Sequence, residues 1–293
     1  MSTDDRRWLE LRVRCPSAGD RSDLLADGLL EFGARGVEER AGWYVSYFDE
    51  PADVAQFISR ARDTIEASTG LGPIRLEHGW QVHEEWAETW KRGLAARRVT
   101  DRIVVHPSWA PPEQVRAGDL VIELDPGMAF GTAEHGTTRG CLRLLDGVVD
   151  AGDQLLDVGA GSGILAIAAV RLGAAGVRAI EGDSYACEAM FDNVRRNGVV
   201  EQVEVVRAWA TSESLRAMGP VHGIIANIEA GLLEPLFDGF VEAMRPGGWL
   251  LVSGLLDHEW DGVRTSLEDR GFRFRDVDAD GEWRSGLFGF VSG

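Results

Sequence analysis

The spacing of apolar residues changes several times over the first 80 positions, and each spacing predicts one element. Every second residue is apolar from 8 to 14, which predicts a half-buried strand. From 23 to 32 the apolar residues recur at helical spacing, and Gly33 follows where a glycine commonly ends a helix. The further elements expected are strands at 34–40 and 43–48 joined by a tight Ala-Gly turn, a helix at 52–67 and a strand at 74–80.

This order, β-α-β-β-α-β, is that of the ferredoxin-like supersecondary unit, so we expect a small α+β domain over residues 1–80. Its composition points to no chemistry of its own, and binding or positioning a partner is the function expected of it. The segment 81–96 is acidic and aromatic, with Trp86 and Trp90 four residues apart on one helical face. We expect a helix there that links this domain to a second one at 97–293.

The second domain alternates between strand and helix patterns. Two strands, 102–106 and 120–124, flank a proline-rich loop. The elements expected after them are a helix at 138–148, a strand ending at Asp157, a helix from Ile164, strands at 177–181, 203–208, 221–227, 249–254, 272–277 and 283–291, and helices at 185–197, 211–218, 232–244 and 261–270. Such alternation predicts an α/β fold with a parallel sheet that is covered on both faces and binds ligands at the carboxyl ends of its strands.

A glycine-rich turn stands at one strand-to-helix junction of this alternation. The run Asp157-Val-Gly-Ala-Gly-Ser-Gly-Ile carries glycines at 159, 161 and 163. Glycine has no side chain to hold a ligand away, so we expect a bound molecule to lie on backbone amides at the helix start. The dinucleotide fingerprint would need its third glycine where this chain has Ile164. Asp-x-Gly-x-Gly-x-Gly instead resembles the first motif of S-adenosylmethionine-dependent methyltransferases with a Rossmann-like sheet.

Two further strand ends carry polar residues that suit such a ligand. Glu181 follows Gly159 by 22 residues (181 minus 159), where a carboxylate can accept hydrogen bonds from both hydroxyls of a ribose. Asp183 is the nearby alternative. Asn227 ends the strand 221–227, and its side-chain oxygen could accept hydrogens from a target amine and orient that nitrogen for methyl transfer. The residues after Asn227 include no aromatic to stack on a base, which disfavours a flipped nucleobase substrate.

The loop at 125–139, rich in Gly and Thr, is the other informative stretch. Thr137 or Thr138 could cap the helix that follows. So many small and hydroxyl residues before the glycine turn also suit a loop that folds over a ligand, and this is the interpretation we favour. His135 could assist proton removal from the amine, although a histidine that only packs the loop is an equal alternative.

Composition and charge narrow the class of protein. The chain has 293 residues and a formal net charge of −18, which repels nucleic acid and suits a basic or neutral partner; a surface that is simply solvated is an equal alternative. No apolar run is long enough for a membrane span, and the N-terminus lacks a secretory signal, so we expect a cytoplasmic protein, and expect it to be a monomer. The three cysteines are far apart, which argues against disulfides or a metal site and favours small core residues.

Several of these motifs together resemble one family. The matching stretches are Asp125-Pro-Gly-Met-Ala-Phe-Gly-Thr with His135 and Thr137-Thr138, the glycine turn, Asp192-Asn193 with Arg196-Asn197-Gly198, and Ala226-Asn227-Ile-x-Ala-Gly. The chain is similar here to the ribosomal protein L-eleven methyltransferases, the PrmA family. The resemblance implies a seven-stranded Rossmann-like methyltransferase sheet, S-adenosylmethionine as cofactor, and methylation of lysine side chains and the N-terminal amine of a large-subunit ribosomal protein, recognised by the ferredoxin-like domain.

The resemblance assigns cofactor contacts to Thr138, Gly159, Glu181 and Asn227. Phe130, Thr132, Asp157 and Gly161 are further residues expected to bind the cofactor, and those expected in catalysis are Asn227 and His135. The chain departs from the family at Glu181, where Asp is usual, and at Ala133-Glu134 and Gly136 beside His135. A lysine methyltransferase for another protein shares all of this chemistry and is the main alternative. A nucleic-acid amino-methyltransferase and a non-catalytic cofactor-binding module are the remaining ones.

Overall fold

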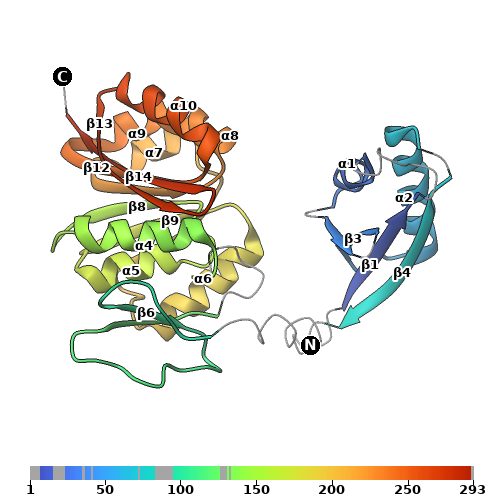
Figure 1. Cartoon of the computed structure of the whole chain (residues 1–293), viewed down its shortest axis with the longest axis horizontal. Coiled ribbons are helices and arrows are strands. Elements are labelled where there is room, and N and C mark those ends of the chain that lie inside the picture. The colour runs from blue at the N-terminus through green and yellow to red at the C-terminus, as the bar shows by residue number, and fades with distance from the viewer. Residues whose placement is uncertain are drawn as a thin grey trace. The chain divides into compact units, whose positions relative to one another are not determined.

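The computed structural model describes residues 7–15, 24–34, 37–40, 42–71, 73–82, 95–125, 131 and 133–291. The chain divides into two compact units, Met1–Gly93 and Leu94–Gly293, which are considered separately (Figure 1). The helix expected at 81–96 falls mainly on residues 83–94, which lie outside the described residues.

The smaller unit is a four-stranded antiparallel sheet with two helices. Its elements are β1 (Arg7–Arg14), α1 (Leu24–Glu31), β2 (Glu38–Arg40), β3 (Trp43–Asp49), α2 (Val54–Thr69) and β4 (Arg75–Val82). The sheet order β2-β3-β1-β4 places the first strand between the third and the fourth. This arrangement confirms the ferredoxin-like α+β fold. Strand β2 is shorter than the predicted 34–40, because the backbone amide of Ala34 still bonds the Leu29 carbonyl at the end of α1.

Alternation along β1 decides which face of this sheet is covered. Leu9, Leu11 and Val13 are fully buried, and the residues between them are only partly buried. The buried side chains pack in one core with Leu29 of α1 and Ile65 of α2. The alternation of apolar side chains along β1 therefore places all of them on the one face of the sheet that α1 and α2 cover.

The larger unit is built around a seven-stranded sheet in the order β10-β9-β8-β11-β12-β14-β13. Its strands are β8 (Gln154–Val158), β9 (Gly176–Glu181), β10 (Val203–Arg207), β11 (Val221–Asn227), β12 (Met244–Leu256), β13 (Phe272–Asp280) and β14 (Trp283–Phe290). Pairing is parallel from β10 to β12, and β14 runs antiparallel to both of its neighbours. The α/β fold with a mostly parallel sheet is thus confirmed.

Helices cover both faces of this sheet (Figure 1). One face packs against α4 (Gly136–Val148), α5 (Ile164–Leu172) and α6 (Ser184–Arg196), and the other against α7 (Ser212–Met218), α8 (Ala230–Leu233), α9 (Phe237–Ala243) and α10 (Asp257–Glu268). The single helix predicted at 232–244 is wrong in detail. A short 3-10 segment, Glu234–Leu236, separates α8 from α9 at Pro235, which cannot continue the backbone hydrogen-bond ladder.

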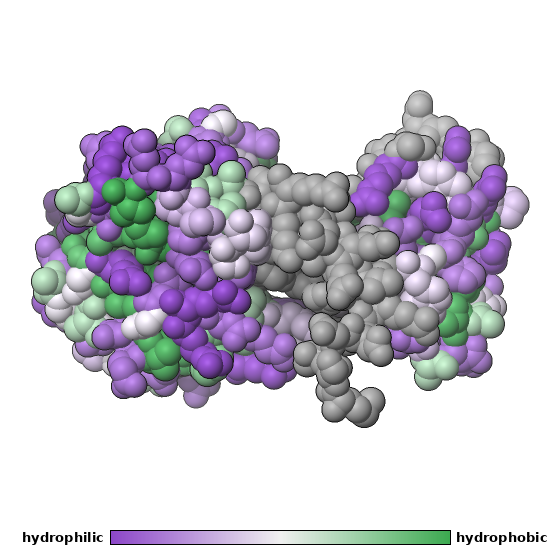
Figure 2. Space-filling model, turned by 90° about the horizontal axis from the view of Figure 1, so that it is seen from below, coloured by the Kyte–Doolittle hydropathy of each residue, from purple (hydrophilic) through white to green (hydrophobic). Residues whose placement is uncertain are grey.

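A separate small sheet joins β5 (Arg97–Arg98), β6 (Ile103–His106) and β7 (Leu120–Glu123), with β6 and β7 parallel. Hydrophilic residues make up most of the described surface visible in Figure 2. Across the described residues, no helix has the length and apolar content needed to cross a membrane. The predicted core role of the cysteines is confirmed, because Cys15, Cys141 and Cys187 are all buried.

Two arginines anchor α4 to the antiparallel end of the sheet. Arg139 pairs with Asp280, and Arg143 pairs with both Asp278 and Asp280 at 2.6 to 2.9 Å. The paired guanidinium groups hold the pKa of Asp280 well below its usual range. Because the loop that precedes the glycine turn leads into α4, which begins at Gly136, this cluster also fixes where that loop ends.

We expect Phe240→Ala to lower the free energy of unfolding by about 3–5 kcal/mol, because Phe240 is fully buried among α7, α9 and the sheet. Urea unfolding followed by circular dichroism measures the change. Phe191→Ala is the matched control, since Phe191 is half exposed and should cost less than about 1 kcal/mol. Equal losses for the two variants would contradict the assignment of the core.

Candidate functional site

Three polar residues lie at the carboxyl ends of neighbouring strands. Asp157 is near the end of β8, and Glu181 and Asn227 are the last residues of β9 and β11, which flank β8 on either side. The start of α4 reaches the same edge, because the Ser253 hydroxyl on β12 donates to the Thr137 carbonyl at 3.4 Å. Residues distant in the sequence are therefore brought to one edge of the sheet, where parallel α/β folds bind ligands.

The glycine turn between β8 and α5 requires its glycines. Gly159, Gly161 and Gly163 have φ values of 70°, 54° and 80°, in the left-handed region that other residues rarely adopt. A Cβ at Gly159 would lie 2.3 Å from Ile228 Cγ2, and a Cβ at Gly163 would lie 2.6 Å from Met190 Cγ. The turn can therefore pack closely against β11 and α6 only without side chains.

The backbone amides of this turn are already hydrogen-bonded within the protein. Those of Gly159 and Ala160 donate to the Ile180 carbonyl, that of Gly163 to the Ala160 carbonyl, and that of Gly161 to Glu181 Oε2 at 2.9 Å. The expectation that the turn would cradle a ligand with its amides is wrong for these four groups. A pyrophosphate needs such free donors, so the geometry also argues against a dinucleotide.

Glu181 is held in place by the chain around it. Oε1 accepts the amide of Asp183 at 2.9 Å, while Oε2 accepts that of Gly161. Each carboxylate oxygen can accept a second hydrogen bond, so capacity for ligand hydroxyls remains. Asp183, the alternative acid, caps α6 by accepting from the Tyr185 and Ala186 amides. Its carboxylate is thus engaged at the helix end.

Three side chains at this edge have buried polar atoms without a hydrogen-bond partner. They are Thr138 Oγ1, both carboxylate oxygens of Asp157, and Asn227 Oδ1. Buried polar groups are nearly always paired in folded proteins, and an unpaired one costs about 1–3 kcal/mol. Unsatisfied atoms at the strand ends therefore indicate a site that is completed by a polar ligand.

Burial raises the pKa of Asp157 to about 7, and the nearby charge of Glu181 acts in the same direction. The backbone amide of Ala166 acts in the opposite direction and favours the charged form. A carboxyl group in this state takes a cationic partner readily, because a positive charge would offset the loss of water.

His135, not Thr137 or Thr138, occupies the N-cap position of α4, and its side chain does not cap the helix. The alternative in which Thr137 or Thr138 caps this helix is therefore wrong, because the helix begins earlier, at Gly136. The imidazole Nδ1 lies 2.7 Å from Thr137 Oγ1, and the ring packs 4.8 Å from the ring of Trp283. Burial, then the charge of Arg139, lowers the pKa of His135. Phe130 and Thr132, also expected in the site, lie outside the described residues.

Trp209 was not singled out by the sequence analysis. It follows the end of β10, and its side chain is 75% exposed. A Cβ at Gly182 would lie 2.4 Å from Cδ2 of the indole, so the ring covers the glycine between Glu181 and Asp183. The sequence does contain a signal for this contact. A tryptophan follows one strand end, and a glycine, Gly182, follows the acidic residue at the end of the neighbouring strand.

The sheet order, the glycine turn and the polar strand ends define the class of Rossmann-like methyltransferases. A family model described as Ribosomal protein L11 methyltransferase (PrmA) matches residues 37–288. The chain belongs to this family, and the resemblance seen in the sequence is confirmed. Methyltransferases of the family use S-adenosylmethionine as methyl donor.

Individual relatives agree over nearly the whole chain. A ribosomal protein L11 methyltransferase of Streptococcus pneumoniae (strain Hungary19A-6) is 32% identical and covers 96% of this chain and 95% of its own. One from Pelotomaculum thermopropionicum is 36% identical and covers 94% and 96%. The crystal structure of a ribosomal protein L11 methylase from Lactobacillus delbrueckii subsp. bulgaricus superposes with a TM-score of 0.60 at 27% identity, over 68% of this chain and 100% of that one.

The raised pKa of Asp157 predicts a pH dependence of stability. Between about pH 4 and pH 7 the unfolded chain ionises this carboxyl group, whereas the folded chain keeps it protonated. The free energy of unfolding should therefore fall as pH rises through this range, by at most a few kcal/mol, relative to an Asp157→Asn variant that cannot ionise. Urea unfolding at a series of pH values measures it, and parallel curves for the two proteins would contradict the assignment.

Proposed function

We propose that this protein transfers methyl groups from S-adenosylmethionine to lysine side chains and the N-terminal amine of ribosomal protein L11. The names of its relatives support this substrate. The observation that carries the chemistry is the buried Asn227 oxygen, an acceptor without a partner at the end of β11. An amine that entered the site would supply the missing donors.

The residues at the strand ends fit the polar groups of the cofactor. Asp157, buried and unpaired, suits its ammonium group, and the Thr138 hydroxyl suits its carboxylate. Glu181 keeps acceptor capacity for the ribose hydroxyls, and Gly159 and Gly161 leave room beside them. The exposed face of Trp209 would take the adenine, because aromatic rings stack on bases. Phe130 and Thr132 are proposed as further contacts of the cofactor.

The cofactor supplies a methyl group on a positively charged sulfur, which is a good leaving group. The protein must then orient a neutral amine and remove water from it. Asn227 would accept the amine hydrogens, so that the nitrogen lone pair faces the methyl group. His135 is the second candidate, because its lowered pKa keeps the imidazole neutral and able to take a proton.

We also propose a basic ribosomal protein as the partner and the cytoplasm as the location. A net charge of −18 suits a basic ribosomal protein and disfavours direct binding of nucleic acid. We assign recognition of the substrate to the ferredoxin-like unit, linkage to the segment 81–96 and methyl transfer to the domain 97–293. The protein acts as a monomer in the cytoplasm, where ribosomal proteins are made.

Glu181→Ala and Trp209→Ala should each weaken S-adenosylmethionine binding about tenfold or more, since hydrogen bonds to a carboxylate and base stacking are each worth roughly 1–3 kcal/mol. Calorimetric titration of the cofactor measures this. Trp209→Phe keeps a ring and should retain most of the affinity. Glu204→Ala, which removes an exposed carboxylate on β10, is the control for Glu181→Ala. Unchanged affinity in Glu181→Ala would remove the ribose assignment.

Methyl transfer to ribosomal protein L11 tests the proposed function directly. The protein is incubated with labelled S-adenosylmethionine and either purified L11 or a full set of ribosomal proteins. We expect label in L11, and kcat about a hundredfold lower for Asn227→Ala, because a group that positions the amine is lost.

His135→Ala, assayed beside it, should lower kcat and alter the pH profile if the imidazole takes the proton. An unchanged profile would leave His135 as a packing residue only.

In the labelling experiment, label in a different protein would replace L11 as the substrate while keeping the chemistry. Absence of label in every protein would overturn the function.

A further inference from the structure

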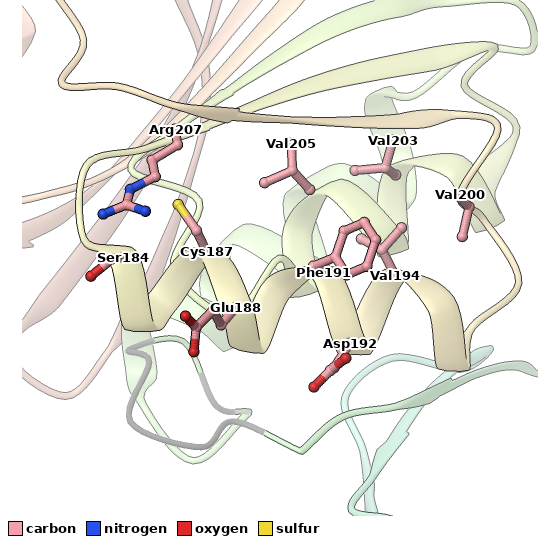
Figure 3. Close-up of a pocket in the computed structure, with 10 residues that line it drawn as sticks. All are labelled: Ser184, Cys187, Glu188, Phe191, Asp192, Val194, Val200, Val203, Val205 and Arg207. Carbon is pink, nitrogen blue, oxygen red and sulfur yellow. The ribbon is translucent and has the colours of Figure 1, made fainter. Parts of the chain in front are cut away.

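A groove lies beside the outermost strand of the seven-stranded sheet and is lined by none of the residues of the proposed cofactor site. It runs between α6 and β10 and has a volume of about 570 Å3 (Figure 3). Strand β10 is last in the sheet order, and β9 is its only partner among the described strands. An edge strand presents unpaired N–H and C=O groups that can pair with an added chain.

The walls of the groove are mainly apolar. Val203 and Val205 line it from the strand, Phe191 and Val194 from the helix, and Val200 from the connection between them. Phe191 is 48% exposed and Val200 is 47% exposed. Soluble proteins seldom leave adjacent large apolar side chains in water without a binding role.

The charge along the helix side of the groove is negative. Glu188 and Asp192 stand four residues apart on α6, both are exposed, and neither forms an ion pair with another described residue. Arg207 and Ser184 close one end of the groove (Figure 3), and Arg207 is the register partner of Glu181 on β9. An apolar channel with two free carboxylates along one side complements a segment that carries both apolar and cationic side chains.

We propose that this groove docks an extended segment of the protein substrate, which adds to the edge of β10 and places alternate apolar side chains against Phe191 and Val200. A lysine or arginine of the same segment pairs with Glu188 or Asp192. The inference rests on the proposed function, because that function supplies a basic protein as the occupant. Strand addition gives affinity through the main chain, while side-chain pockets give selectivity.

Such docking would act on affinity for the protein substrate and not on methyl transfer itself. The groove uses no residue of the proposed cofactor site, and its near end opens beside the Glu181 strand end. A bound segment would hold the substrate at the reactive edge of the sheet and raise the local concentration of its target amines.

The test compares substrate kinetics of full-length variants. Val200→Asp, and separately the pair Glu188→Lys and Asp192→Lys, should raise KM for L11 about tenfold, the loss expected for roughly one buried side chain or ion pair. Neither change should alter kcat or the calorimetric affinity for S-adenosylmethionine. In addition, amide hydrogen exchange at Val203–Arg207 should slow when L11 is added to the wild-type protein.

Matched variants at the opposite edge of the sheet control for charge and exposure. Val277→Asp on β13 changes a valine that is 39% exposed, and the pair Asp261→Lys and Glu268→Lys on α10 makes the same change in net charge. Both should leave KM for L11 unchanged. An equal rise in KM for these controls would mean that overall charge, and not the groove, attracts the substrate.

The outcomes separate the two proposals. If the wild type methylates L11 and the groove variants keep its KM, the groove inference is overturned while the function stands. If the wild type methylates no ribosomal protein, the function fails first and the groove loses its assigned occupant. If the variants instead abolish self-association seen by analytical ultracentrifugation, the groove joins two copies of this chain, which also overturns the inference.

Discussion

The position of Asn227 depends on two glycines, Gly159 and Gly254. Because they have no side chains, the turn after β8 and the strand β12 can both lie against Ile228, the next residue after Asn227. A Cβ at Gly159 would lie 2.3 Å from the Ile228 side chain, and one at Gly254 would lie 2.4 Å from the Ile228 carbonyl oxygen. Ile228 is therefore held between the turn after β8 and the strand β12. Because the backbone on one side of Asn227 is clamped and the other side belongs to β11, its amide oxygen has little freedom.

This clamp explains why the site tolerates unsatisfied polar atoms. Thr138 and Asp157 are buried on elements fixed by their neighbours, and the buried amide oxygen of Asn227 lies at the strand end that Ile228 holds in place. The ion pairs of Arg139 and Arg143 with β13 hold the start of α4 in the same way. The unpaired polar atoms cost free energy, and the packing of the cores on both faces of the sheet offsets that cost. A ligand that hydrogen-bonds to these atoms would remove it.

The two edges of the large sheet differ in a way that suits a protein substrate. The β13 edge is antiparallel and carries two acidic side chains, Asp278 and Asp280, in ion pairs with α4. The β10 edge is apolar beside α6, where Glu188 and Asp192 form no ion pair with another described residue. Carboxylates without an ion-pair partner thus lie next to exposed apolar side chains at one edge of the sheet. A basic segment bound there would both pair with the carboxylates and bury its own apolar side chains.

The sequence by itself determined the order and type of most elements, the ferredoxin-like and parallel α/β folds, and the family. These follow from local periodicity and short motifs, which depend on neighbours along the chain. It also pointed to Glu181 and Asn227, because strand ends can be read from the pattern.

Only the tertiary structure decided which groups are free. The turn amides are taken by Ile180 and Glu181, α4 begins at Gly136, and Trp209 lies on Gly182 from an adjacent strand. Each of these depends on partners far away in the sequence. The groove beside β10 likewise exists because a helix and a strand edge meet in space, which no local pattern can reveal.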